Sequence, residues 1–181
     1  REFTLVVINA PPVAVADTAT VLAGQAVTIA VTANDVTLVP ITSIAIATPP
    51  TQGTAVVSGL DIVYTAPTTA SPPVTFTYIA SGPGGNSAPA TVTVTVNPLP
   101  VATNLTATTT PATPVQVTLN SGAAGGPFTG AAVVSLSPAG SGTTAIAASG
   151  GNYVLTFTPN SAFSGVSVVT YTLSNAFTTS T

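Results

Sequence analysis

Charged and chemically reactive side chains are almost absent from this chain. Only 3% of its 181 residues are charged, residues 62–181 contain no Asp, Glu, Lys, Arg or His, and Cys, Met and Trp do not occur. Enzymes rely on titrating groups for proton transfer, on activated nucleophiles and on metal ligands. A serine nucleophile needs a base, and the chain has neither His nor Lys. The sequence therefore predicts a protein that is not an enzyme.

The scarcity of cations excludes further classes of partner. Arg1 is the only basic side chain, and the formal net charge is −3. Nucleic acids and anionic membrane surfaces are bound by several Lys or Arg, and no apolar run approaches the roughly 20 residues of a membrane helix. We therefore expect no nucleic-acid partner and no membrane insertion. The lack of trypsin-type cleavage sites after residue 1 suits an extracellular, protease-rich location.

The chain contains an internal repeat. Residues 7–14 (VINAPPVA) return as residues 95–102 (TVNPLPVA), an offset of 88 residues. Residues 64–78 and 157–171 correspond with an offset of 93, so the second copy has gained five residues in between. We expect these in the glycine-rich segment 121–130.

Alternating residues predict β-strands throughout. Val27–Val31, Thr91–Val96, Val115–Leu119 and Val154–Phe157 place β-branched or large apolar residues at every second position, a pattern typical of strands with one buried face. Clusters of Gly, Pro, Asn and Ser separate the runs, and helix signals are nearly absent. The predicted fold is all-β, with two tandem immunoglobulin-like β-sandwich domains in an elongated arrangement.

Four segments of the first copy carry a resemblance to a known family. They are residues 12–21 (PVAVADTATV), 27–35 (VTIAVTAND), 62–67 (IVYTAP) and 76–78 (FTY). Together they resemble the bacterial Ig-like or cadherin-like tandem repeats of large surface or secreted proteins of the adhesin or autotransporter type. The resemblance covers residues 12–97 well and residues 98–181 through their start and end. It implies an immunoglobulin-like sandwich, an extracellular location, and neighbouring repeats of the same parent protein as partners.

The repeat alignment predicts the domain boundaries. Residues 1–11 are expected to hold a cloning remnant, the last strand of a preceding repeat and a linker. Residues 12–97 form the first repeat, and residues 98–181 form a second repeat without its last strand, whose counterpart is Ala90–Val96. Backbone groups beside such a gap lack partners. We predict that residues 4–9 of one molecule pair with the incomplete repeat of another, in a strand-exchange self-association.

Asp17, Asn34 and Asp35 form a weak calcium candidate. The resemblance implies it, because some relatives bind calcium at repeat ends. Calcium takes six to eight oxygen ligands, usually including several carboxylates, and the second copy has Leu105 in place of Asp17. The alternative is that Asn34 and Asp35 bond their own loop backbone. We expect no required cofactor.

The four tyrosines are the other candidates. Tyr64 and Tyr78 alternate with apolar neighbours, which predicts core positions with hydrogen-bonded hydroxyls, and Tyr171 should mirror Tyr78. Tyr153 follows Gly150, Gly151 and Asn152, so we expect it at a hairpin, exposed, as a weak ligand-binding candidate.

The sequence favours a non-catalytic structural spacer or stalk repeat of a bacterial cell-surface or secreted adhesin-like protein. The alternative is a binding module for cell-surface carbohydrate or a host protein, acting through loops or Tyr153. A third reading is an accessory domain that supports a distant catalytic domain. A binding module should present an exposed aromatic cluster or a well-formed pocket, whereas a spacer should not.

Overall fold

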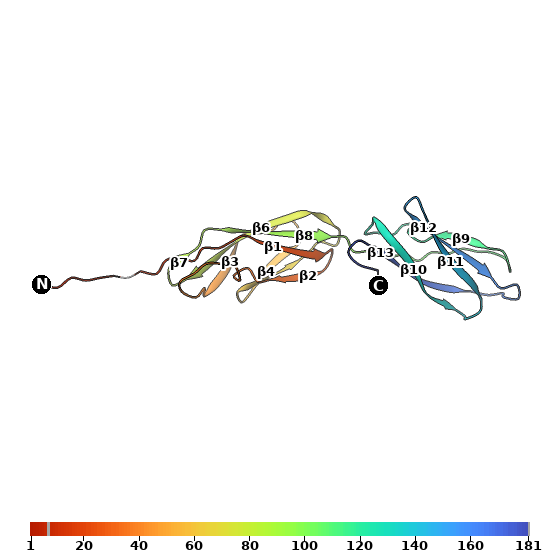
Figure 1. The fold of residues 1–181 in the computed structure, drawn as a ribbon, viewed down its shortest axis with the longest axis horizontal. Coiled ribbons are helices and arrows are strands. Elements are labelled where there is room, and N and C mark those ends of the chain that lie inside the picture. Colours follow the sequence, from red (N-terminus) through yellow and green to blue (C-terminus); the bar gives the residue numbers. More distant parts are fainter. Residues whose placement is uncertain (7, 181) are drawn as a thin grey trace. The chain divides into compact units, whose positions relative to one another are not determined.

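The computed structural model describes residues 1–6 and 8–180. Within them every regular element is a β-strand, as the alternating pattern predicts (Figure 1). The chain divides into two compact units, unit 1 (Arg1–Asn97) and unit 2 (Pro98–Thr181). A search of the described residues finds no helix with the length and hydropathy of a membrane span.

Unit 1 is a sandwich of two sheets. The first sheet has the order β1-β8-β6-β3, with β7 pairing with β6, and the second has the order β2-β5-β4 (Figure 1). All pairs are antiparallel except β1 with β8, which run parallel. The strands are β1 (Asp17–Leu22), β2 (Ala26–Ile29), β3 (Ser43–Thr48), β4 (Thr54–Ser58), β5 (Asp61–Thr65), β6 (Ser71–Gly82), β7 (Gly85–Asn86) and β8 (Ala90–Asn97).

The alternation seen in the sequence sets the faces of β8. Val92, Val94 and Val96 are buried, whereas Thr91 and Thr95 are exposed. This is the arrangement that period-two residues produce when one face of a sheet covers a core. Of the nineteen buried hydrophobic residues among those described, sixteen lie in unit 1. Unit 1 therefore has a well-formed core.

Unit 2 retains only part of this architecture. Its sheets have the orders β10-β13 and β11-β12-β9, from β9 (Val115–Thr118), β10 (Phe128–Ser137), β11 (Gly142–Ser149), β12 (Asn152–Pro159) and β13 (Val168–Asn175). Among residues 98–180 no strand takes the place of β8, and residues 105–110, which correspond to β1, form no strand. In unit 1 the strand β1 pairs only with β8. Residues 105–110 therefore have no strand to pair with, which explains why they form no strand themselves.

The five extra residues of unit 2 do not lie in the glycine-rich segment 121–130, so that expectation is wrong. Val36 and Ala124 form equivalent isolated bridges, and Ile44 and Ala131 are equivalent paired positions in β3 and β10. The segment between these markers is residues 36–44 in unit 1 and residues 124–131 in unit 2, so it is one residue shorter in unit 2. Instead β11 and β12 have eight residues each, against five in β4 and β5. The glycines serve the local geometry, because a Cβ on Gly125 would collide with the Leu99 carbonyl.

Candidate functional site

A buried polar cluster in unit 1 is centred on Tyr78 of β6. Its side chain is completely buried. The hydroxyl oxygen lies 2.6 Å from the carbonyl oxygen of Val31, 2.7 Å from Oδ1 of Asp35 and 3.2 Å from the carbonyl oxygen of Val15. A tyrosine hydroxyl carries one hydrogen, so three acceptors share a single donor. Burial raises the pKa of Tyr78 far above its ordinary value, and the hydrogen bond with Asp35 raises it further.

The structure brings Asp17, Asn34 and Asp35 to this cluster. Asp35 Oδ1 also accepts a hydrogen bond of 2.8 Å from the Val15 amide, and Asn34 Nδ2 donates to the Ala16 carbonyl at 3.1 Å. These bonds fasten the loop to the segment before β1, rather than closing the loop on itself as the alternative expected. Burial raises the pKa of Asp17, and the neighbouring Asp35 carboxylate raises it further.

The cluster offers two acidic side chains, Asp17 and Asp35, as calcium ligands. Oδ2 of each is buried without a hydrogen-bond partner among the described residues. Asp35 Oδ1 is already engaged, and the described residues contain no group of three or more His, Cys, Asp or Glu. Calcium takes six to eight ligands. The visible role of the cluster is to hold two segments of unit 1 together.

Unit 2 repeats the tyrosine at the centre of this cluster without the acids. The Tyr171 hydroxyl donates to the Thr103 carbonyl at 2.6 Å and lies 3.1 Å from the Leu119 carbonyl. These two carbonyls lie 88 residues after the two that Tyr78 faces, so the prediction that Tyr171 mirrors Tyr78 is confirmed. Because the tyrosine occurs in both units and the acids in one, the tyrosine contact is part of the fold itself.

The other two tyrosines also serve packing. Tyr64 is completely buried, as predicted, with its ring stacked on Phe76 and its hydroxyl donating to the Gln52 carbonyl at 2.9 Å. Tyr153 follows a hairpin turn, but the expectation that it is exposed is wrong. It is half-buried, and it packs against the core cluster that contains Leu155. Residues at alternate positions of a strand share a face, which places Tyr153 on the inner side of β12.

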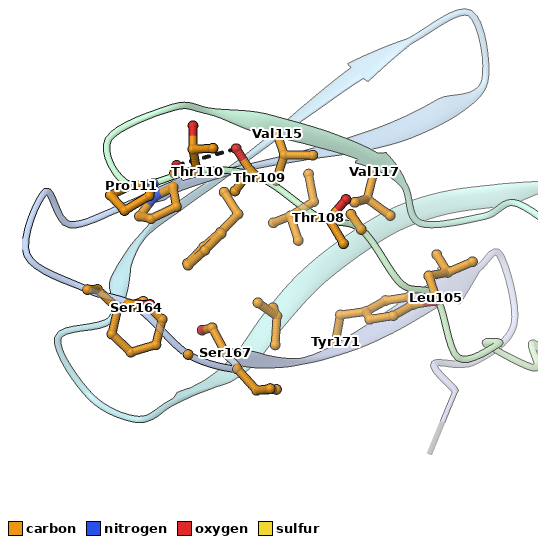
Figure 2. Close-up of a pocket in the computed structure, with 18 of the residues that line it drawn as sticks. Leu105, Thr108, Thr109, Thr110, Pro111, Val115, Val117, Ser164, Ser167 and Tyr171 are labelled. Atoms are coloured by element: carbon orange, nitrogen blue, oxygen red, sulfur yellow. Dashed lines mark hydrogen bonds between the residues drawn. The ribbon is translucent and has the colours of Figure 1, made fainter.

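Unit 2 contains a cavity of about 470 Å³ that sequence reasoning missed. Its walls are the segment 105–111, strands β9 and β12, and residues 163–171, which include the start of β13. Figure 2 shows Leu105 and Tyr171 at one end, with Pro111 and Ser164 toward the other. We call this cavity the unit 2 groove.

The unit 2 groove corresponds to the place of β8 in unit 1. At the offset of 93 residues, Phe157 and Val169 in its walls match Tyr64 and Phe76, and Phe76 pairs with Val92 of β8. In unit 1 these wall positions are at most 1% exposed, whereas Phe157 and Val169 are only half-buried. The repeat alignment contained the signal for this groove, because it shows that unit 2 has no counterpart of Ala90–Val96.

Comparisons with known proteins agree with this architecture. The model of the bacterial Ig domain family matches residues 9–95 and again residues 97–181. No curated protein matches the chain.

Two solved structures are distantly similar, both endo-fucoidan hydrolases from glycoside hydrolase family 107. MfFcnA4 is 17% identical with a TM-score of 0.39, over 94% of this chain and 28% of that one. MfFcnA9 is 16% identical with a TM-score of 0.32, over 89% and 31%. The chain thus spans less than a third of the length of each. Since the family model covers both units, the chain belongs to the bacterial Ig domain family and contains two tandem copies of that domain.

Proposed function

We propose that the two units are non-catalytic spacer repeats of a bacterial cell-surface or secreted protein of the adhesin type. The observation that carries this proposal is the parallel pairing of β1 with β8 in unit 1; unit 2 is included because it is a second copy of the same domain. β1 is the first strand of the unit and β8 is the last. Tension along the chain therefore enters at the start of β1 and leaves at the end of β8.

Parallel end strands resist such tension well. The register runs from Asp17 opposite Val92 to Leu22 opposite Asn97. A pull along the strands therefore loads all the hydrogen bonds between β1 and β8 at the same time. Each backbone hydrogen bond contributes only ~0.5–1.5 kcal/mol net, but here they must break at once rather than one after another. The buried side chain of Val94 adds apolar contact behind the ladder. This geometry supports a load-bearing role.

The side-chain chemistry of both units supports an inert role. The hydroxyls of Tyr64, Tyr78 and Tyr171 bond backbone carbonyls of their own unit. Residues 62–181 offer no charged side chain, and in unit 1 Oδ1 of Asp35 is bonded to the Val15 amide and the Tyr78 hydroxyl. Few reactive side chains are thus left to face a substrate. The unit 2 groove does meet the pocket criterion for a binding module, but it lies where unit 1 has β8, which favours a polypeptide strand over a carbohydrate as its occupant. An exposed, extracellular setting suits a chain of this kind.

Force spectroscopy tests the load-bearing role directly. The chain has no Cys, so introduced cysteines define the pulling points. Thr18→Cys with Asn97→Cys pulls β1 and β8 from opposite ends in shear, whereas Thr18→Cys with Thr91→Cys pulls them apart from the same end. We expect a clearly higher unfolding force for the first pair. Equal forces for the two pairs would contradict the proposal.

A glycan array, probed with and without calcium, tests the inert role. The spacer proposal expects no signal in either condition. A saturable signal would instead identify a binding module for cell-surface carbohydrate and overturn the proposal.

A further inference from the structure

We propose that the unit 2 groove is an acceptor site for a β-strand with β-branched side chains at alternate positions. Its occupant in this chain is the segment Thr4–Asn9 of a second copy. This inference stands whether or not the units bear tension.

The N-terminal part of β13 has a free edge that faces the unit 2 groove. In unit 1 the equivalent strand β6 pairs with β3 on one side and β8 on the other, whereas β13 pairs with β10 on one side only. On the other side, residues 178–180 turn back along the C-terminal part of β13, and the Ser180 amide donates to the Leu173 carbonyl at 2.7 Å. Among the described residues no strand pairs with residues 168–172 on the groove side. An unpaired strand edge offers a row of amides and carbonyls for another chain.

The unit 2 groove also has an apolar wall that suits the inward face of a strand. Val117, Phe157 and Val169 line the unit 2 groove and are half-buried. The positions that match Phe157 and Val169 in unit 1 are fully covered, and there the inward valines of β8 are themselves at most 4% exposed. A strand with apolar residues at alternate positions therefore satisfies both the backbone edge and the apolar wall.

The segment Thr4–Asn9 has the sequence pattern of the absent strand. At the repeat offset of 88 residues, Thr4–Asn9 aligns with residues 92–97 of β8, so Thr4, Val6 and Ile8 take the positions of the inward valines. Val6 is 74% and Ile8 84% exposed, and neither lies in a strand. Residue 7 lies outside the described residues. The described part of the segment is therefore apolar, accessible and in register with the strand whose place is open.

The position of donor and acceptor determines the kind of assembly. The donor segment precedes unit 1, and the acceptor lies in unit 2. A reciprocal exchange between two copies closes as a dimer, whereas a head-to-tail exchange continues into chains or rings. In either case we expect the degree of association to rise with concentration.

Sedimentation velocity of the 181-residue chain tests the assembly, with two variants of matched charge. Ile8→Asp places a carboxylate on the inward side of the donor strand, and Leu5→Asp, at a residue that is 77% exposed, places one on the outward side. Both should leave the circular dichroism spectrum unchanged. We expect Ile8→Asp to abolish the association and Leu5→Asp to retain it. A strict monomer at all concentrations, or equal association of both variants, would overturn the second copy as occupant.

A labelled peptide tests the groove separately. The probe is a fluorescein peptide with the sequence of Ala90–Asn97, compared with the same peptide carrying Val94→Asp. We expect saturable anisotropy for the first peptide, no binding of the second, and slowed amide exchange in residues 168–172 on binding. Absence of binding by the first peptide would overturn the acceptor site itself.

Discussion

Replacing Tyr78 by Phe removes one oxygen from a fully buried site and should strongly destabilise unit 1. The hydroxyl is close to two carbonyls and the Asp35 carboxylate. A hydrogen bond to a charged group contributes ~1.5–3 kcal/mol, and a buried acceptor left unpaired costs ~1–3 kcal/mol. We therefore expect a loss of ~2–4 kcal/mol in the free energy of unfolding.

The matched comparison is Tyr171→Phe in unit 2. There the hydroxyl faces two neutral carbonyls and the side chain is half-buried, so the expected loss is nearer ~1 kcal/mol. In domains of this size 1 kcal/mol shifts the melting temperature by ~4–8 °C. Tyr78→Phe should thus lower the melting temperature of unit 1 by ~8–32 °C, and Tyr171→Phe that of unit 2 by ~4–8 °C.

Differential scanning calorimetry of the full chain measures both shifts, and hydrogen exchange assigns each transition to its unit. Asp35→Asn is the control, because it keeps an oxygen beside the hydroxyl while removing the charge. The melting temperature of unit 1 in Asp35→Asn should lie between those of Tyr78→Phe and the parent chain. A smaller loss of stability for Tyr78→Phe than for Tyr171→Phe, or an unchanged melting temperature of unit 1 in Asp35→Asn, would show that the buried hydroxyl does not stabilise unit 1 in this way.

Three further predictions concern strain, pH and metal. Gly53→Ala should cost several times more than Gly59→Ala in urea unfolding; both have positive φ, but a Cβ on Gly53 would lie 2.6 Å from the Tyr64 hydroxyl and one on Gly59 meets open space. Because burial raises the pKa of Asp17 above 3.8, its contribution to stability is full below that pH and lost as pH rises through the folded pKa. Asp17→Asn should therefore stabilise unit 1 at pH 7 and not at pH 3; equal effects would refute this. Neither EDTA nor calcium should move the melting temperature, whereas an upward shift with calcium that Asp17→Asn abolishes would assign a metal site.

The strand pattern was predictable because alternation is a local property. β8 lies where the alternating Val and Thr residues place it, and the buried positions of Tyr64 and Tyr78 follow from the same pattern. The site was less predictable, because it depends on contacts between distant segments. Asn34 and Asp35 bond residues before β1, about twenty positions away in the chain, and local turn chemistry alone does not indicate these partners.

Tyr153 shows why exposure was misjudged. A preceding Gly-Gly pair indicates a hairpin but not which face of the next strand turns inward. The hairpin strands of unit 2 are longer than those of unit 1, which shifts the turn relative to the first copy. The unit 2 groove was missed for a different reason. The alignment revealed an absent strand, but the volume that its inward side chains would occupy becomes visible only when both sheets are in place.

The acidic cluster gives the two units different responses to their surroundings. Tyr78 in unit 1 shares its hydrogen with a carboxylate, whereas Tyr171 in unit 2 faces neutral carbonyls only. Unit 2 has no Asp, Glu, Lys, Arg or His side chain, so it contains no side-chain carboxylate to protonate in acid and no side-chain ion pair for salt to screen. The electrostatic effects of acidity and salt on side chains therefore act on this chain through unit 1, whereas unit 2 responds to salt only through the strength of its apolar burial.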